Sequence, residues 1–147
     1  MSARALSLEG AVDIPPWPRR QLARCAVGAA WLMVRLPPQR LCRVLEFVRR
    51  GSRPATEEEA RRARNAVIAV SVPCAGPRCL QRSVATVLLC RVGRAWPDWC
   101  TGVRTQPFQA HAWVAVDGKP VGENAHEIGF FHVMLSVPFT DGADRGR

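Results

Sequence analysis

A chain of 147 residues with 48% hydrophobic content is long enough for one domain with its own core, which excludes a wholly disordered protein. The net charge is +9, and Lys119 is the only lysine, so the basic surface is almost entirely arginine and favours anionic partners of unspecified kind. The longest apolar run, 25–34, is about half the length of a membrane span, and the first twenty residues lack the apolar segment of a secretory signal. We therefore predict a cytoplasmic protein with free thiols and no transmembrane helix.

The first half of the chain predicts three helices behind an extended arm. Residues 1–19 contain three prolines and form the expected arm, because each proline restricts the residue before it. Helices are predicted over 19–36, from Pro38 to about residue 50, and from 57 to about 70. Gly51 is expected to cap the second, and a capping box starting at Thr56 opens the third. The apolar face of the first helix is expected to comprise Leu22, Cys25, Ala26, Ala29, Ala30 and Met33, and the arginines of the third, Arg61, Arg62 and Arg64, are interpreted as a solvated face.

The second half predicts a fourth helix followed by strands. The helix spans 78–92, and its buried stripe is expected to contain Leu80, Val84, Val87 and Leu88. Strands are predicted over 99–105, 109–116, 119–123 and 131–136, with Asp117-Gly118 as a hairpin turn. Helices first and strands after predict an α+β fold, in which the helices pack on a small antiparallel sheet. We expect one domain over 20–137, with a helical part (20–76), a part with the last helix and the sheet (77–137), and a loose tail over 138–147.

Cys79 is the predicted nucleophile of an active site. Pro77 and Arg78 precede it, which is expected to place it in the first turn of the fourth helix. The N–H groups and the dipole at that end stabilise a thiolate, and the same N–H groups can hold an oxyanion during acyl transfer. The alternative is a buried structural cysteine, because the chain has five other cysteines. The further candidates for contacts with substrate or oxyanion are Gln81, Arg82, Ser83 and Trp113.

His111 is the predicted partner of that thiol. It lies in a strand that is apolar on both faces, so we expect the strand to be central and the imidazole to be shielded from water. A satisfied core histidine is the alternative interpretation. Glu123 follows the Asp117-Gly118 turn and is expected opposite His111, within one residue of register, where its carboxylate can orient the imidazole. Asp117 is the second choice for this role, because the turn already explains it.

The sequence offers weaker support for a metal or a nucleotide. Cys74 and Cys79 are separated by four residues, and His126 and His132 lie downstream, but the tight pair of ligand pairs that is typical of structural zinc is missing. Neither glycine-rich phosphate motif is present. We therefore predict neither a metal nor another cofactor, and no binding to nucleic acid.

Several motifs of this chain together resemble a known family. They are Cys79-Leu80-Gln81-Arg82-Ser83, the run from Leu88-Leu89 to Gly93, Gly102-Val103-Arg104, Pro107-Phe108, Ala110-His111-Ala112-Trp113-Val114, Asp117-Gly118 and Pro120-Val121. They are similar to the transglutaminase-like cysteine proteases of lasso peptide biosynthesis, the B proteins that remove the leader from a ribosomally made precursor. The resemblance covers about residues 20–137 and implies a transglutaminase-like or papain-like core. It implies that Cys79 is the catalytic cysteine and His111 the catalytic histidine. The acidic member, commonly Asp in the family, would correspond to Glu123 or its neighbour.

The resemblance also implies partners. Some members carry an additional leader-binding domain, and this chain resembles the split form, in which leader recognition belongs to a separate small protein. The core peptide would then pass to an asparagine-synthetase-like cyclase that closes a macrolactam ring. Residues 35–50, with Arg43, Arg49 and Arg50, are the expected docking surface. The two competing hypotheses are a catalytically silent adaptor and an acyltransferase that uses the same three residues.

Overall fold

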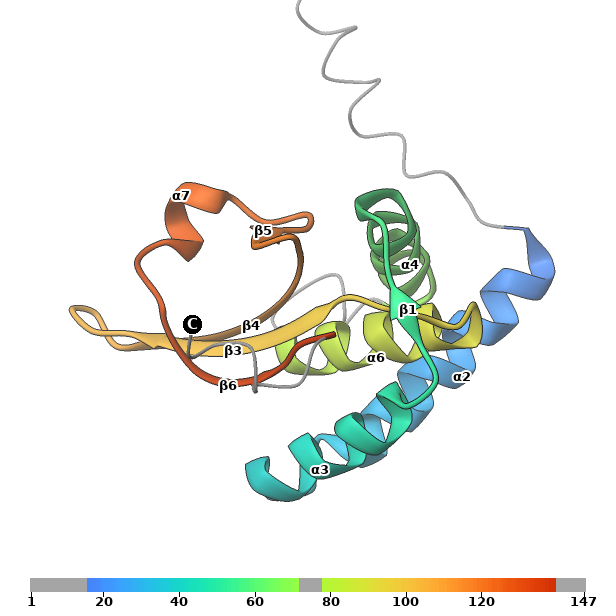
Figure 1. The fold of residues 1–147 in the computed structure, drawn as a ribbon, viewed down its shortest axis with the longest axis horizontal. Coiled ribbons are helices and arrows are strands. Elements are labelled where there is room, and N and C mark those ends of the chain that lie inside the picture. The colour runs from blue at the N-terminus through green and yellow to red at the C-terminus, as the bar shows by residue number, and fades with distance from the viewer. Residues whose placement is uncertain (1–15, 72–77, 140–147) are drawn as a thin grey trace, which may run out of the picture.

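The computed structural model describes residues 16–71 and 78–139 of the chain. Its elements confirm the predicted α+β fold, with the long helices gathered on one side and a small antiparallel sheet, together with one short helix, on the other (Figure 1). The helices are α2 (Trp17–Met33), α3 (Pro38–Arg49), α4 (Glu57–Val70), α6 (Cys79–Val92) and the short α7 (Ala125–Ile128). The strands are β1 (Arg53–Pro54), β2 (Ala95–Trp96), β3 (Asp98–Arg104), β4 (Gln109–Val116), β5 (Lys119–Pro120) and β6 (His132–Val137).

Helix α2 begins inside the stretch that the sequence predicted to be an extended arm. It starts at Trp17, because Pro16 precedes the first turn and Pro18 lies within it, where a missing N–H breaks no hydrogen bond of the helix. The side chain of Trp17 is 65% exposed. Residues 1–15 of the predicted arm lie outside the described part of the chain.

The buried face of α2 is narrower than the predicted one. Ala23, Ala26 and Ala30 are buried, whereas Leu22 and Cys25 are exposed. Small side chains at this spacing allow α2 to lie close to α4 and α6, against which it packs. The prediction was wrong for Leu22, Cys25 and Ala29, whereas Met33 is partly buried against the core as predicted. Apolar spacing alone does not say which of two adjacent stripes faces the core.

Helix α4 begins with the predicted capping box. The Thr56 hydroxyl accepts a hydrogen bond from the N–H of Glu59, and the carboxylate of Glu59 accepts one from the N–H of Thr56. Arg61 and Arg62 are exposed and pair with Glu57 and Glu58 one turn earlier, as expected of a solvated face. The third arginine of the run, Arg64, does not belong to that face and is described with the site below.

Helix α6 is the centre of the domain. It packs against α2, α3 and α4 and also against β2, β3 and β4. Residues 81–87 are all buried, so the predicted single stripe was wrong: helices cover one side of α6 and the sheet covers the other. Two of its buried hydroxyls are satisfied within the helix, since Ser83 donates to the carbonyl of Leu80 and Thr86 donates to that of Arg82.

The sheet has the order β5-β4-β3-β6, and its neighbouring strands are antiparallel. Strand β4 is internal, as predicted, and its register places His111 opposite Gly102 of β3. Two features were not predicted: the short parallel pair of β1 and β2, and helix α7. The first residues of the predicted tail are held to the domain, because Arg49 donates to the carbonyl of Pro138 and the N–H of Phe139 donates to Asp98. Across 16–71 and 78–139, none of the helices combines the length and apolar character that crossing a bilayer requires.

Candidate active site

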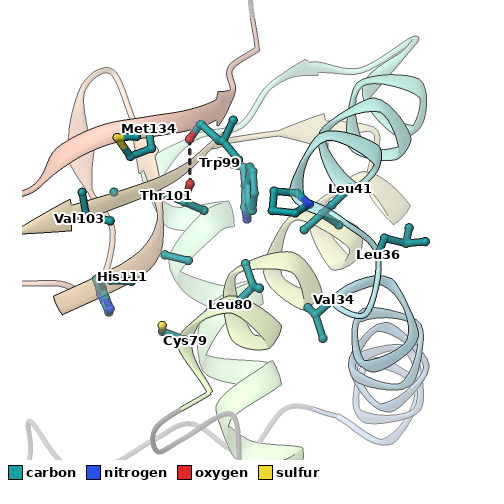
Figure 2. Close-up of a pocket in the computed structure, with 15 residues that line it drawn as sticks. Val34, Leu36, Leu41, Cys79, Leu80, Trp99, Thr101, Val103, His111 and Met134 are labelled. Atoms are coloured by element: carbon teal, nitrogen blue, oxygen red, sulfur yellow. Dashed lines mark hydrogen bonds between the residues drawn. The ribbon is translucent and has the colours of Figure 1, made fainter. Parts of the chain in front are cut away.

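Three predicted site residues from separate parts of the chain meet in the structure. Cys79 is the first residue of α6, His111 lies in β4, and Glu123 lies between β5 and α7. The Nε2 atom of His111 is 3.3 Å from Oε2 of Glu123, and the side chains of His111 and Cys79 share a hydrogen bond. Figure 2 shows the sulfur of Cys79 and the ring of His111 on the same side of a pocket. The three side chains therefore form a continuous row of thiol, imidazole and carboxylate.

The environment of Cys79 favours its thiolate. The hydrogen bond from His111 is the largest influence and lowers the pKa of the thiol, and the backbone N–H of Ala112 and the charge of Arg82 act in the same direction. Partial burial opposes them but does not prevail. By contrast, burial raises the pKa of the Cys90 thiol to about 12. The thiol at the helix start is thus the one prepared for nucleophilic chemistry.

The imidazole of His111 is held between aromatic rings and two acidic partners. Trp113 stacks on it with ring centroids 6.0 Å apart, and Phe131 lies 5.7 Å away. Hydrogen bonds with Cys79 and Glu123 raise the pKa of His111 to about 9, against the opposing effect of burial. Since Nε2 faces Glu123, Nδ1 is the nitrogen left for the thiol. With a pKa of about 9, the imidazole is protonated at neutral pH, and it lies beside a thiol whose own pKa is lowered.

Glu123 reaches His111 by a different route from the predicted one. The sequence predicted a strand over 119–123 paired with β4, but β5 ends at Pro120 and its ladder consists of two residue pairs. One further hydrogen bond follows, from the N–H of Val121 to the carbonyl of Val114. Gly122, at φ 70°, then turns the chain so that Glu123 faces the imidazole. Asp117, the second choice, is exposed in the hairpin turn at φ 53°.

An apolar pocket of about 390 Å³ opens beside the thiol (Figure 2). Cys79 and His111 lie on one side of it, and on the other side lie Val34 and Leu36 from the loop after α2 and Leu41 from α3. Further lining residues are Pro38, Leu80, Trp99, Thr101, Gly102, Val103, Ala110, Ala112, Met134 and Leu135. No acidic or basic side chain other than His111 is among these residues. The pocket can therefore receive an apolar group next to the reactive sulfur.

A comparison with protein families matches residues 23–136 to the Transglutaminase-like superfamily. The chain belongs to this superfamily. Its members include cysteine proteases and commonly have cysteine peptidase or acyltransferase activity. Comparisons with curated proteins and with solved structures found no match.

The remaining predicted site residues of this superfamily member contact other parts of the protein around Cys79 and His111. Gln81 is buried, and its amide donates to the carbonyl of Val27 in α2. Ser83 accepts a hydrogen bond from the indole N–H of Trp99 at 3.0 Å. Trp113 packs on the imidazole. In the structure, these side chains therefore hold neighbouring parts of the protein in place around Cys79 and His111.

Two residues at the site were not predicted to be there. Arg64 of α4 lies with its Nη2 atom 3.6 Å from Oε1 of Glu123, and Phe131 packs against His111. Arg82, a predicted candidate for contact with substrate or oxyanion, lies with its Nη2 atom 3.5 Å from the same oxygen of Glu123. The signal for Arg64 was its position four residues after Ala60, which is fully buried. Residues four apart lie on the same face of a helix, so Arg64 faces the protein interior. Arg61 and Arg62 are offset from that face.

The other ionisable candidates lie away from the row. His126 and His132 are exposed, and His126 packs edge-on against Phe130. Of the cysteines, Cys25 is exposed and Cys90 is buried, and Cys74 lies outside the described residues. Within residues 16–71 and 78–139, no cluster of three or more histidine, cysteine or acidic side chains is arranged to hold a metal ion.

Proposed function

We propose that this chain is a cysteine peptidase whose nucleophile is Cys79, and that it removes the leader from the precursor of a lasso peptide. The observation that carries the proposal is the row of Cys79, His111 and Glu123 at the edge of an apolar pocket. Cysteine catalysis needs a thiolate, a group that moves its proton and a group that orients the imidazole. The motifs around Cys79 and His111, which resemble those of lasso peptide proteases, support the choice of substrate.

In the proposed reaction, the thiolate of Cys79 attacks the carbonyl carbon at the junction of leader and core. The N–H groups in the first turn of α6 face the oxyanion that forms with the new C–S bond. The imidazolium of His111 gives its proton to the leaving nitrogen as the C–N bond breaks. Water then attacks the thioester and passes a proton back to His111, and breakage of the C–S bond releases the leader and restores the thiolate.

The pocket supplies the binding part of the proposal. An apolar side chain close to the scissile bond would fill the space between Leu41 and Leu80, bringing the carbonyl group to the sulfur. Binding that fixes this geometry lowers the barrier by removing the need to orient two free groups. We therefore place an apolar residue of the precursor in this pocket during cleavage.

A separate leader-binding protein and a macrolactam cyclase are the proposed partners. The proposed docking surface is α3 and its flanks, where Arg43 is exposed and the exposed ring of Phe47 lies 5.2 Å from the guanidinium carbon of Arg50. Arg49 is a poor choice for testing this surface, because it donates to the carbonyl of Pro138 within the chain. Reversing the charge of Arg43 and Arg50 is the appropriate test, with complex formation as the readout.

The decisive experiment on the reaction is Cys79→Ala, incubated with precursor and the leader-binding protein and followed by mass spectrometry. The proposal expects loss of the leader with the parent chain and intact precursor with Cys79→Ala, although binding persists. The control is Cys25→Ala, which removes an exposed thiol from α2 and should leave cleavage unchanged. Cleavage by Cys79→Ala would contradict the proposal. Transfer of the acyl group to an added amine rather than to water would identify an acyltransferase. Binding of the precursor without cleavage, equal in the parent chain and in Cys79→Ala, would identify an adaptor.

A further inference from the structure

The carboxylate of Glu123 contacts three cationic or potentially cationic side chains. One oxygen, Oε2, faces Nε2 of His111 at 3.3 Å. The other, Oε1, lies 3.5 Å from Nη2 of Arg82 and 3.6 Å from Nη2 of Arg64. The two arginines come from different helices, α6 and α4, and α4 itself packs against β4. Each oxygen of the carboxylate is thus directed toward a separate side of the site.

These arginines are not surface residues that happen to be nearby. The side chains of Arg82 and Arg64 are only 11% and 18% exposed, and that of Glu123 is 17% exposed. Burying charged groups is costly unless they are paired, and burial lowers the pKa of the Arg64 guanidinium. A structure that buries two arginines beside one carboxylate therefore relies on their pairing.

The backbone next to Glu123 is shaped around Arg64. A Cβ placed on Gly122 would lie 2.7 Å from the Cζ, Nε and Nη1 atoms of Arg64. Gly122 also has φ 70°, which favours glycine. Only a residue without a side chain allows the guanidinium to lie this close to the backbone and reach the carboxylate.

We propose that Arg64 and Arg82 are positioning residues that clamp Oε1 of Glu123, so that Oε2 remains directed at His111. This inference rests on the proposed function, because it assigns a purpose to the orientation of His111. The clamp keeps Glu123 ionised and prevents its carboxylate from turning away into solvent. Arg64 acts on the reaction through Glu123 and His111, and Arg82 acts by the same route in addition to lowering the pKa of Cys79 by its charge.

The clamp can be distinguished from a simple charge effect by the direction in which the pKa of His111 moves. The charged and titratable groups facing the site are Cys79, Arg82, Arg64 and Glu123, with Arg104 over the neighbouring Phe131 ring. Removing a nearby cation that acts only by its charge would raise the pKa of His111. Removing a clamp lets Glu123 leave, so that the imidazolium loses its partner and the pKa falls.

The test is an NMR titration of the histidine ring signals in the full chain carrying Cys79→Ser, so that no thiol titrates together with His111. The chain has three histidines, which makes assignment simple. We expect Arg64→Gln to lower the pKa of His111 by about 1 unit. The matched controls are Arg61→Gln and Arg62→Gln on the same helix, whose exposed arginines pair with Glu57 and Glu58, and these should leave it unchanged. A rise, or no change, with Arg64→Gln would overturn the proposal.

A second pair of variants approaches the contact from the other side. The methyl group of Gly122→Ala would overlap the guanidinium of Arg64, whereas that of Gly118→Ala would have no atom within 4 Å. Both glycines have positive φ, 70° and 78°, so both variants carry a comparable backbone strain. We expect only Gly122→Ala to lower the pKa of His111, and equal effects of the two variants would overturn the clamp. Because the titration needs no substrate, its failure is separate from a failure of the proposed peptidase activity, which Cys79→Ala tests.

Discussion

The Nε2 atom of His111 lies 3.3 Å from Oε2 of Glu123, although the strand that leads toward Glu123 ends at Pro120. The contact therefore does not arise from strand pairing. It depends on the turn at Gly122, where the chain leaves the sheet and carries the carboxylate back to the imidazole. A regular strand through this segment would direct alternate side chains to opposite faces and fix their partners by register.

The raised pKa of His111 and the lowered pKa of Cys79 predict the pH range of the reaction. On the acid side, activity should appear at a lower pH than the usual titration of a thiol, because the hydrogen bond from His111 lowers the pKa of Cys79. It should fall on the alkaline side near pH 9, where the imidazolium loses the proton that the leaving nitrogen requires. The measurement is kcat/KM for precursor cleavage as a function of pH.

Glu123→Gln should move the alkaline limit of that profile to lower pH. The amide removes the negative charge that stabilises the imidazolium, so the pKa of His111 falls, and we expect a shift of about 1 unit. A limit that moves from about 9 to about 8 lowers the imidazolium population only about twofold at pH 8, but about tenfold at pH 10, so kcat/KM should fall by these factors. Glu127→Gln, on the exposed surface of α7, serves as the control. A profile of Glu123→Gln that coincides with that of the parent would exclude Glu123 as the orienting residue.

Met134→Glu should weaken cleavage by placing a charge in the apolar pocket. Met134 lines the pocket from β6, and its residue is 64% exposed, so the substitution is compatible with folding. We expect kcat/KM to fall by roughly tenfold or more, because an apolar substrate group would have to contact a carboxylate. The matched control is Val133→Glu, since Val133 is also exposed on β6 but does not line the pocket. Equal losses with both variants would show that the pocket does not receive the substrate.

Thr56→Ala should destabilise the fold without acting on the chemistry. It removes the hydroxyl that accepts the N–H of Glu59 at the start of α4, and such a loss costs about 1 kcal/mol. The measurement is denaturant unfolding, with Thr56→Ser as the variant that should restore most of the stability. Cleavage at a temperature where both variants are folded should match that of the parent. A selective loss of cleavage in fully folded Thr56→Ala would mean that the helix start affects the site.

Local patterns in the sequence were sufficient for most of the elements and for the place of Cys79 at the start of a helix. The spacing of apolar residues predicted the long helices, and Thr56 and Gly51 predicted one start and one end correctly, because capping depends on residues close in the chain. The position of Cys79 after Pro77-Arg78 placed it at a helix start for the same reason. Asp117-Gly118 located the turn between β4 and β5, although the length of β5 was wrong.

Only the tertiary structure decided how these parts are combined. The sequence by itself determined that α6 is apolar and begins with a thiol, whereas burial of its whole circumference depends on the helices and strands that surround it. It also could not separate Arg64 from Arg61 and Arg62, because all three have the same chemistry and lie on one helix. Their difference comes from what faces them: solvent and nearby glutamates for Arg61 and Arg62, and the carboxylate of Glu123 for Arg64. Periodicity reports which side of an element is apolar, but contacts between distant residues form only when the elements pack.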